Sequence, residues 1–477
     1  MRGGIQWNPV GNEDSMDLAG QRVVVVGLAR SGIAAARFLA SRGARVAATD
    51  CKGPAELPPE VLRLAEQGVV LELGGHRASS FTAADLVVVS PGVPWELPEL
   101  RAAREAGVPV MAELELGCRE IKGPLAAVTG TKGKSTTTAA LGAMLRQAGV
   151  EVRVGGNIGE AVTGLLEGAT AHTTFVLEVS SFQLEGTESF RPRVAVFLNL
   201  STDHLDRHPS FEDYARAKSR IFQNQTPDDW AVVNADDPGV MARAARGLAR
   251  RVPFSARPGK DEGAFFDDAG AAVLRLSGRS ETLFERRQLR LPGDHLALDL
   301  LAAATAARLL GAPAQAIAAA AADFSGVEHV LERVAEIDGV LFFNDSKATN
   351  VDAAHKSLSA FPGPLLPILG GRYKGGDFAQ LQDVLGRRGK AVFAIGEAKE
   401  RISEALSSVV PVFACASLAE AVELAFAEAE AGDTVVLAPA CSSFDMFRDY
   451  AHRGQAFKEE VRALASRVAA AKEEAGG

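Results

Sequence analysis

Short apolar runs alternate with longer Ala-rich segments along most of this chain. Strong runs lie at residues 22–27, 85–89, 125–128 and 194–199, and each leads into a turn rich in Gly, Pro, Ser or Thr. Continuous apolar runs of this length are typical of parallel strands that helices cover on both faces. The repeated alternation predicts an α/β protein built on mostly parallel sheets.

The length of the chain predicts more than one domain. With 477 residues, the chain is too long for a single hydrophobic core. We expect a Rossmann-like domain at 16–122, a central domain with a P-loop ATPase-type sheet at 123–325, and a second Rossmann-like domain at 326–477. Residues 1–15 are polar and Gly-rich without an apolar core, which is unlike a signal peptide. They predict a disordered arm or an artefact of start-site choice.

The first predicted domain opens like a dinucleotide-binding fold. A strand at Arg22–Gly27 leads into LARSG and a helix, and a second strand at Arg45–Thr49 ends at Asp50. Ala29 replaces the central glycine of GxGxxG, which disfavours NAD and favours another nucleotide on a related fold. Ser90–Pro94 is a candidate for the same ligand site because it follows a strand, and a plain connection to the next helix is the alternative.

The strongest chemical signal is the stretch 125–145, LAAVTGTKGKSTTTAALGAML. A strand, a Gly/Thr turn and a helix bring backbone N–H groups and a helix N-terminus together on an anion. In this turn, Lys134 would reach the β- and γ-phosphates of a nucleotide, and the Ser135 hydroxyl would ligate Mg²⁺. Val128 stands where the usual pattern has glycine, so an ordinary capped helix is the alternative. The flanking strand and helix favour a nucleoside-triphosphate site.

Four polar residues of the central domain are candidates for the same site. Glu178 ends a predicted strand, where a carboxylate could contact Mg²⁺ opposite the loop serine, although a solvated strand end is the alternative. Asn157 lies in a Gly-rich segment and local sequence favours a turn former. His204 follows another strand end, where a core histidine is the alternative. Helical spacing alone predicts that Lys218 is a surface lysine.

The third predicted domain begins with a hairpin and continues as alternating strands and helices. Strands at 331–337 and 340–344 are joined by Asp338 and Gly339, the dipeptide typical of a type I′ turn. Polar or Gly-rich loops then follow three strand ends, at residues 344–350, 370–377 and 439–445. Each loop alone would be ordinary, but together they predict a second ligand site on a parallel sheet.

Composition limits the classes of partner. The net charge is −9 with no basic run, so we expect no nucleic-acid partner, and local Lys and Arg must meet phosphorylated ligands. No uncharged apolar stretch is long enough to span a membrane, and the Ala-rich run at 300–322 predicts two buried helices. Reduced thiols in the cytosol are expected because the cysteines are far apart and form no CxxC: Cys51, Cys118, Cys415 and Cys441.

Four motifs together resemble the Mur ligases. They are the phosphate loop at 130–135, SSFQLE at 180–185, NDSKATN at 344–350 and PACSSFDMF at 439–447, and the resemblance runs from about residue 16 to the C-terminus. The last two motifs are typical of the members that add D-glutamate. The resemblance implies a cytoplasmic, ATP-dependent enzyme of peptidoglycan precursor synthesis. It would phosphorylate the alanine carboxylate of UDP-N-acetylmuramoyl-L-alanine and couple the acyl phosphate to D-glutamate, as a monomer acting on small molecules and without nucleic-acid or membrane partners.

The resemblance also implies roles for individual residues. Residues implied for ATP are Gly130, Thr131, Lys132, Gly133, Lys134, Ser135, Thr136, Asp345 and Lys347. Ligands implied for two Mg²⁺ ions are Ser135, Glu178, His204 and Lys218, and Lys134 joins the last three as catalytic residues. The nucleotide-sugar residues would be Asp50, Lys52, Ser90, Pro91, Gly92 and Asn157. The D-glutamate residues would be Thr349, Lys374, Ser443, Phe444 and Tyr450.

Lys218 is implied to be carbamylated, against the surface position that spacing predicts. Carbamylation needs a neutral amine, so the resemblance predicts a lowered pKa for this lysine. Two departures from the family pattern bear on ATP. His295–Asp299 reads HLALD where the family has two asparagines that help to seat adenine, and Val330 stands where it has an arginine near the phosphates. Arg333 is an unlikely replacement, because an odd offset along a strand points to the opposite face. We therefore expect ATP to bind more weakly here, or to be seated differently.

Other functions remain open at this point. A Mur ligase that adds another amino acid and folylpolyglutamate synthase are the nearest enzymes. The C-terminal motifs argue against the first, and the second lacks a domain like residues 23–110. A nucleotide-binding homologue without catalysis, acting as a sensor or scaffold, is the alternative from a different class. The presence of Lys134, Glu178, His204 and Lys218 argues against it.

Overall fold

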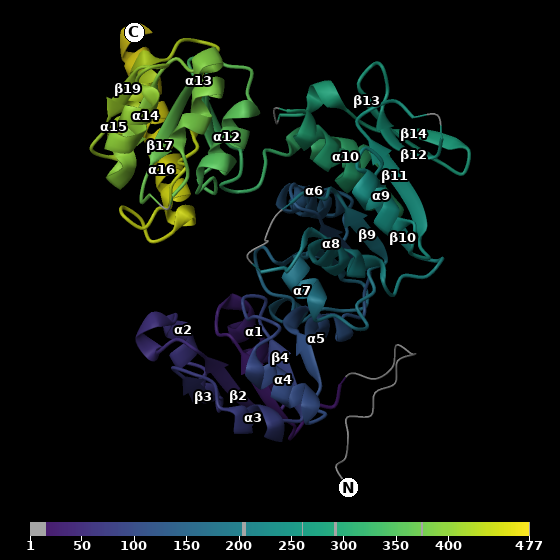
Figure 1. Ribbon diagram of the computed structural model, residues 1–477. Coiled ribbons are helices and arrows are strands. Elements are labelled where there is room, and N and C mark those ends of the chain that lie inside the picture. Colours follow the sequence, from purple (N-terminus) through teal and green to yellow (C-terminus); the bar gives the residue numbers. More distant parts are fainter. Residues whose placement is uncertain (1–15, 203–206, 260, 291–292, 374, 477) are drawn as a thin grey trace. The chain divides into compact units, whose positions relative to one another are not determined.

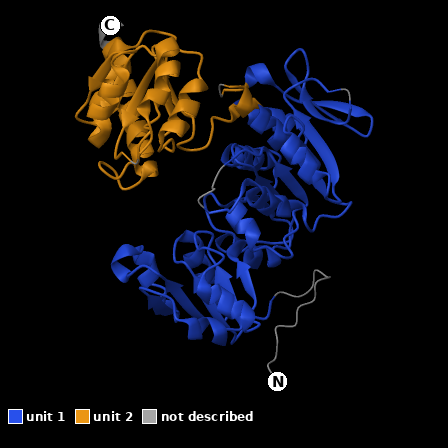
Figure 2. Cartoon of the chain, viewed as in Figure 1, with its two compact units in different colours: residues 1–288, 298–322 blue, residues 289–297, 323–477 orange. Residues whose placement is uncertain are grey.

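The structure is a computed structural model that describes residues 16–202, 207–259, 261–290, 293–373 and 375–476. The chain divides into two compact units, residues 1–288 with 298–322 and residues 289–297 with 323–477 (Figure 2). Among the described residues the strands form three sheets, two in the first unit and one in the second (Figure 1). The expectation of a disordered arm at 1–15 lies outside the described residues.

The first sheet is fully parallel, with the strand order β3-β2-β1-β4-β5. Alternate residues of β1 face opposite sides: Val23 and Val25 pack with α1 and α5, whereas Val24 and Val26 pack with α3 and α4. The strands are β1 (Arg22–Val26), β2 (Arg45–Asp50), β3 (Val70–Leu73), β4 (Leu86–Val89) and β5 (Val110–Ala112). The helices are α1 (Arg30–Ser41), α2 (Pro59–Leu62), α3 (Ala78–Ala83), α4 (Pro98–Glu105) and α5 (Glu113–Arg119).

The central sheet has the order β14-β13-β12-β11-β10-β9-β6-β8-β7. It is parallel from β7 to β12 and antiparallel from β12 to β14. The strands are β6 (Leu125–Thr129), β7 (Val152–Gly156), β8 (Thr174–Glu178), β9 (Val194–Phe197), β10 (Trp230–Asn234), β11 (Arg250–Ser255), β12 (Gly263–Phe266), β13 (Ala271–Leu276) and β14 (Arg279–Glu285). Every residue of β6, β8 and β9 is buried, which matches the apolar runs at their centres.

The helices of the central region cover this sheet and continue beyond it. They are α6 (Lys134–Gln147), α7 (Ser181–Glu185), α8 (Phe211–Ser219), α9 (Pro238–Ala244), α10 (Asp294–Leu309) and α11 (Ala314–Asp323). The last two confirm the predicted pair of helices in the Ala-rich run. Ser210 caps α8, because its hydroxyl accepts a hydrogen bond from the Asp213 N–H at 3.1 Å.

The third sheet has the order β15-β16-β20-β17-β18-β19 and is parallel except for the β15–β16 hairpin. Asp338 and Gly339 both have positive φ angles, 52° and 78°, which confirms the predicted hairpin turn. The strands are β15 (Glu332–Ile337), β16 (Val340–Asn344), β17 (Leu365–Gly370), β18 (Val392–Ile395), β19 (Val412–Ala414) and β20 (Thr434–Leu437). The helices are α12 (Val351–Ser359), α13 (Gln382–Arg388), α14 (Lys399–Leu406), α15 (Leu418–Glu428) and α16 (Tyr450–Gly476), of which α15 and α16 pack on one face.

The predicted α/β fold class is confirmed, and one region was missed. The sequence analysis placed no element between residues 220 and 288, where the structure has β10 to β14 and α9. In β13 and β14, charged and apolar side chains are mixed because these antiparallel strands, the edge strand β14 and its neighbour β13, are partly exposed. The predicted boundaries at 122 and 325 remain a prediction.

Candidate active site

The phosphate loop joins β6 to α6 in the form that an anion site requires. Gly130 and Gly133 have φ angles of 155° and 80°, which favour glycine, and α6 begins directly after them. Asn199 supports the loop from the neighbouring strand end: its Oδ1 accepts from the N–H groups of Thr131 and Lys132 at 3.1 and 2.8 Å. The sequence analysis missed Asn199, although a polar residue that ends the strand beside β6 is a usable signal.

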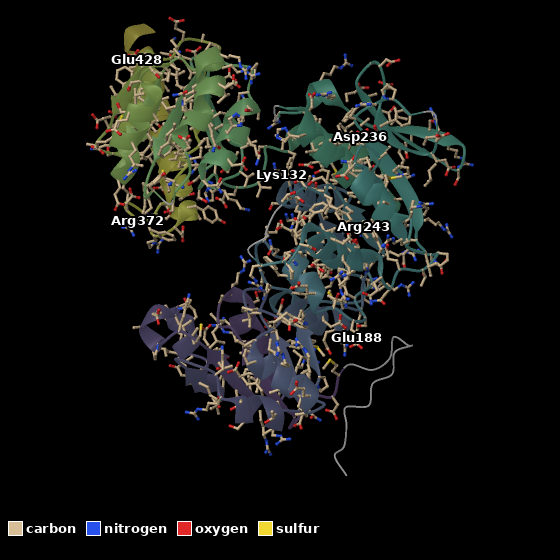
Figure 3. The ribbon with its side chains drawn as sticks, viewed as in Figure 1. Lys132, Glu188, Asp236, Arg243, Arg372 and Glu428 are labelled. Atoms are coloured by element: carbon tan, nitrogen blue, oxygen red, sulfur yellow. The ribbon has the colours of Figure 1, made fainter. Side chains whose placement is uncertain are left out.

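The two lysines of the loop have different environments. Lys134 Nζ donates to the carbonyl oxygens of Gly130 and Thr131 at 3.0 and 2.9 Å, so its ammonium group lies over the loop. Lys132 is exposed (Figure 3). The arrangement places a cation where phosphate oxygens would meet the loop N–H groups.

Glu178 is the centre of a polar cluster beside the loop. Its carboxylate accepts hydrogen bonds from Ser135 Oγ and from Asn157 Nδ2, each at 2.7 Å. Strand β8 pairs with both β6 and β7, and this pairing brings the three side chains together. Glu178 is 2% exposed. The local sequence favoured Asn157 as a turn former, but its amide side chain also contacts this cluster.

Carboxylate, hydroxyl and amide oxygens are the ligands that Mg²⁺ prefers, so the side chains at Glu178 fit a magnesium site. The described residues contain no group of three or more His, Cys, Asp or Glu side chains that could hold a metal ion. A Mg²⁺ ion here would therefore share few protein ligands with phosphate oxygens and water, as Mg²⁺ sites commonly do.

Lys218 is buried, so the surface position predicted from helical spacing is wrong. It is 2% exposed, its Nζ donates to the Gly130 carbonyl at 2.7 Å, and it lies 4.8 Å from the centre of the Tyr214 ring. The Tyr214 hydroxyl and Thr131 Oγ1 are 3.0 Å apart, so α8 packs this face on the phosphate loop. Helical spacing in one sequence cannot show which neighbour covers a helix. His204 lies outside the described residues.

Asp299, which replaces a family asparagine, lies against the same loop. A Cβ atom on Gly133 would stand 2.2 and 2.6 Å from its two carboxylate oxygens, and Thr137 Oγ1 donates to its main-chain oxygen at 3.4 Å. Burial raises the pKa of Asp299 to about 7, against the opposing effect of Lys134. Leu296, at the other replaced position, is buried.

The first sheet carries the predicted nucleotide-sugar residues other than Asn157 at its carboxyl edge. Asp50 accepts from the N–H groups of Leu28 and Lys52 at 2.7 and 2.9 Å, so it fixes the turn after β1. Ser90 Oγ donates to the Gly27 carbonyl at 2.7 Å and holds the two turns together. Pro91 is half-buried and Gly92 exposed.

In the second unit, the three predicted loops follow adjacent strands. They leave the ends of β16, β20 and β17, which are neighbours in the sheet. Arg453 of α16 holds them together: it is 1% exposed and donates to the carbonyl oxygens of Ser346, Cys441 and Gly370 at 2.9, 3.1 and 3.4 Å. Burial lowers the pKa of Arg453 to about 10. The sequence analysis missed this residue, which lies on a helix beyond the recognised motifs.

The remaining predicted residues of this unit differ in exposure. Asp345 is buried, and burial raises its pKa to about 6. Ser443 is buried and Thr349 half-buried, whereas the exposed residues are Lys347, Phe444 and Tyr450. Lys374 lies outside the described residues.

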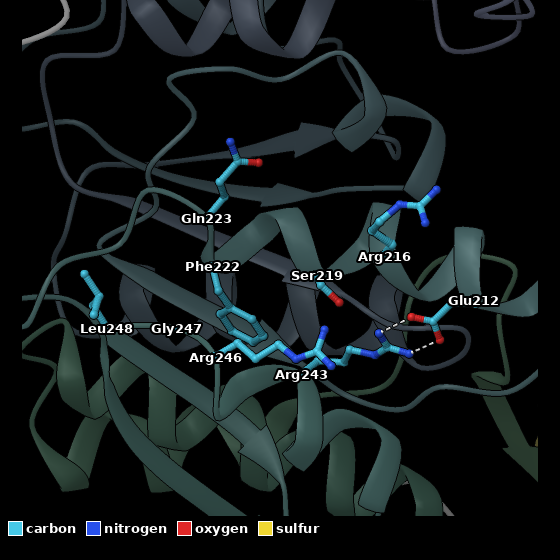
Figure 4. A pocket seen from close by; sticks show the side chains of 9 residues that line it. All are labelled: Glu212, Arg216, Ser219, Phe222, Gln223, Arg243, Arg246, Gly247 and Leu248. Carbon is cyan, nitrogen blue, oxygen red and sulfur yellow. Dashed lines mark hydrogen bonds and ion pairs between the residues drawn. The ribbon is translucent and has the colours of Figure 1, made fainter.

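A cavity of about 200 Å³ lies beside α8, and Lys218 is not among the residues that line it (Figure 4). Residues 212, 216 and 219 recur there at helical spacing and lie on a different face of the helix from Lys218. Inside the cavity, Arg243 donates to both carboxylate oxygens of Glu212 at 2.6 and 2.5 Å, which ties α9 to α8. The cavity lies away from the phosphate loop.

Comparison with known proteins decides the family. Three family models match: "Mur ligase MurD-like, N-terminal domain" at residues 21–112, "Mur ligase middle domain" at 128–307 and "Mur ligase, glutamate ligase domain" at 331–441. The chain belongs to the Mur ligase family. The matched ranges contain the first sheet, all of the central sheet except the start of β6, and the third sheet, in that order.

Similar Mur ligases align over nearly the whole chain. The UDP-N-acetylmuramoylalanine–D-glutamate ligase of Acidobacterium capsulatum is 48% identical over 458 residues, which cover 96% of this chain and 99% of that protein. The ligase of the same name from Geotalea daltonii is 46% identical over 450 residues, covering 94% and 99%. Among solved structures, the UDP-N-acetylmuramate-alanine ligase MurC of Thermotoga maritima matches with a TM-score of 0.58 at 20% identity, over 93% of this chain and all of that one. This structural match shows the shared fold. In the part of this Mur ligase that is described, no helix is long and apolar enough to cross a bilayer.

Proposed function

We propose that this Mur ligase joins D-glutamate to UDP-N-acetylmuramoyl-L-alanine and converts ATP to ADP and phosphate. The observation that carries the proposal is the near-complete alignment with ligases of that name, at 42–48% identity. The phosphate loop and the cluster around Glu178 support it, because a nucleotide phosphate and a divalent cation both find matching groups there.

The chemistry requires an activated carboxylate, because a carboxylate oxygen is a poor leaving group. The alanine carboxylate oxygen attacks the γ-phosphorus of ATP, ADP leaves, and an acyl phosphate forms. The D-glutamate amine then attacks the acyl carbon and loses a proton, and phosphate leaves with its bonding electrons. The protein supplies positioning and charge neutralisation for both steps.

The phosphate loop and Glu178 would serve the first step. Lys134 and the loop N–H groups would hold the phosphates, and the Ser135 hydroxyl and the Glu178 carboxylate would hold Mg²⁺. Bound there, Mg²⁺ neutralises charge that develops on the phosphate oxygens. Asn157 would orient Glu178 and face the nucleotide-sugar.

Lys218 would carry a carbamate that, with His204, holds a second Mg²⁺. Lys218 is buried beside the phosphate loop, and carbamylation requires its neutral amine, because the amine nitrogen must attack carbon dioxide and release a proton. Protein prepared with ¹³C-bicarbonate should give a carbamate carbon signal that Lys218→Arg abolishes. A wild-type spectrum without that signal, in protein that is catalytically active, would refute carbamylation.

The two other substrates would occupy the remaining sheet edges. The nucleotide-sugar would bind at the residues set out above for the first sheet, with Asp50 fixing the turn beneath it. D-Glutamate would bind in the second unit at the loops that Arg453 joins, with Ser443, Thr349 and Lys374 as polar contacts. The exposed rings of Phe444 and Tyr450 would line its entrance.

The product tests the proposal. Purified protein with ATP, Mg²⁺, UDP-N-acetylmuramoyl-L-alanine and D-glutamate should form a compound with the mass of the D-glutamyl amide. Lys134→Ala should form about a hundredfold less, whereas Lys122→Ala, outside the proposed site, should match wild type. If the wild-type enzyme forms product only with another amino acid, the proposal that D-glutamate is the substrate is wrong.

A further inference from the structure

Two arginines without an assigned role connect the first and central sheets inside one compact unit. Arg30 begins α1, and its Nη2 donates to the Asn157 carbonyl of the central region at 3.0 Å. Arg207 follows β9 in the central region, and its Nη1 and Nη2 donate to the Gly92 and Val93 carbonyls at 3.0 and 3.2 Å. Each guanidinium therefore extends from one sheet to a strand-end turn of the other.

Both arginines lie near the topological switch point at the carboxyl ends of β1 and β4. In the order β3-β2-β1-β4-β5, the strand connections change direction here, which is where open α/β sheets bind ligands. The turns after β1 and β4 are in contact, because a Cβ on Gly27 would stand 2.7 Å from Val93 Cγ2. Arg30 follows the first turn and Arg207 is bonded to the second, so both cations lie beside these two turns.

The hydrogen-bond partners of these two arginines are neutral groups. Within the described ranges both guanidinium groups bond to neutral carbonyl oxygens, and neither forms an ion pair. Burial raises the pKa of the Glu113 and Glu185 carboxyls, and the charges of Arg30 and Arg207 respectively oppose that rise. Two such cations stand out in a chain with a net charge of −9.

We propose that Arg30 and Arg207 bind the diphosphate of the nucleoside-diphosphate sugar. This inference rests on the proposed function and adds two residues to it. Guanidinium groups suit phosphate oxygens because they offer paired N–H donors in one plane, and the N-terminus of α1 adds N–H groups of its own. Each arginine would exchange a carbonyl partner for a phosphate oxygen.

The position of Arg30 also links the proposed diphosphate-binding site to the proposed reaction site. Its partner Asn157 donates to Glu178 at 2.7 Å, and Glu178 accepts from Ser135 at 2.7 Å. A chain of hydrogen bonds through Asn157 therefore connects the Arg30 side chain, which would hold the diphosphate, to Glu178 and Ser135, which are proposed to hold Mg²⁺. The sugar and its alanine would extend from the turns after β1 and β4 toward that cluster.

Calorimetric titration of UDP and of uridine separates this role from a structural one. Arg30→Ala and Arg207→Ala should each weaken UDP binding by about 10- to 100-fold, as expected for a lost charged hydrogen-bond partner, and should leave uridine binding unchanged. Arg30→Lys should recover part of the loss, because the charge remains. Arg37→Ala is the matched control, since Arg37 is exposed on the same helix.

The outcomes distinguish this inference from the proposed function. Equal losses for UDP and uridine would show that the arginines only hold the sheets together, and unchanged UDP binding in the double variant would overturn the inference. In the ligase assay, the variants should raise KM for the nucleotide-sugar with smaller changes in kcat and in KM for ATP. A wild-type enzyme without ligase activity that still binds UDP through both arginines would refute the proposed function alone.

Discussion

Replacing Asp299 by Asn should change how the stability of the protein depends on pH. Asp299 is 8% exposed and lies against the phosphate-loop residue Gly133. Burial penalises its charged form and raises its pKa from 3.8 to about 7. The folded protein consequently carries an ionised, buried carboxylate only above neutral pH.

The sign and size of the effect follow from proton linkage. Because the carboxyl has the higher pKa in the folded state, the folded protein binds more protons than the unfolded chain between pH 3.8 and about 7. The free energy of unfolding therefore falls as the pH rises through this window and is constant above it. From pH 5.5 to pH 8 the loss is about 2 kcal/mol, at roughly 1.4 kcal/mol per pKa unit. Asn cannot ionise, so Asp299→Asn removes this loss.

Calorimetric melting at pH 5.5 and pH 8 measures the difference. The stability of Asp299→Asn relative to wild type should rise by about 2 kcal/mol between the two pH values, a shift of about 4 °C in relative Tm for the unit that contains it. Asp268→Asn, which changes an exposed carboxyl of the same unit, should melt in parallel with wild type. If Asp299→Asn also melts in parallel with wild type, its carboxylate ionises freely and the reasoning fails.

Three further substitutions test residues that are proposed to shape the ATP site and the loops of the second unit. Asn199→Ala removes the acceptor for the N–H groups of Thr131 and Lys132, so KM for ATP should rise about tenfold in steady-state kinetics, with nucleotide-sugar KM as the control. Arg453→Met leaves three buried carbonyl groups without their donor and should destabilise the second unit by about 3 kcal/mol in urea unfolding; an unchanged midpoint would contradict this. Val330→Arg restores the cation that the family pattern has, so KM for ATP should fall, and an unchanged KM would refute the idea that its loss weakens ATP binding.

The elements that sequence predicts well are those whose environment is uniform. Strands such as β6 and β9 are buried along their length, so a continuous apolar run identifies them. The phosphate loop is equally readable, because glycines at positive φ and a following helix leave a local signature. The edge strand β14 and its neighbour β13 were missed because they are partly exposed and mix charged with apolar residues.

The parts that sequence could not predict depend on contacts between distant residues. Lys218 looks like a surface residue until α8 is seen to pack on the Gly130 carbonyl. Arg453 joins loops that leave three different strands, and no local pattern indicates this. Asn199 was predicted only as the end of a strand. Its side chain accepts from the N–H groups of Thr131 and Lys132, which lie 68 and 67 residues away in the sequence, so no local pattern indicates this contact.

Phosphate release by the purified protein tests the central claim most directly. ATP, Mg²⁺ and UDP-N-acetylmuramoyl-L-alanine would be supplied with D-glutamate, L-glutamate, meso-diaminopimelate or no amino acid. We predict steady release only with D-glutamate, and retention of that activity would show that the site with Asp299 and Val330 still uses ATP. No release with any amino acid, at high ATP and with bicarbonate added, would contradict the account and favour a nucleotide-binding protein without catalysis.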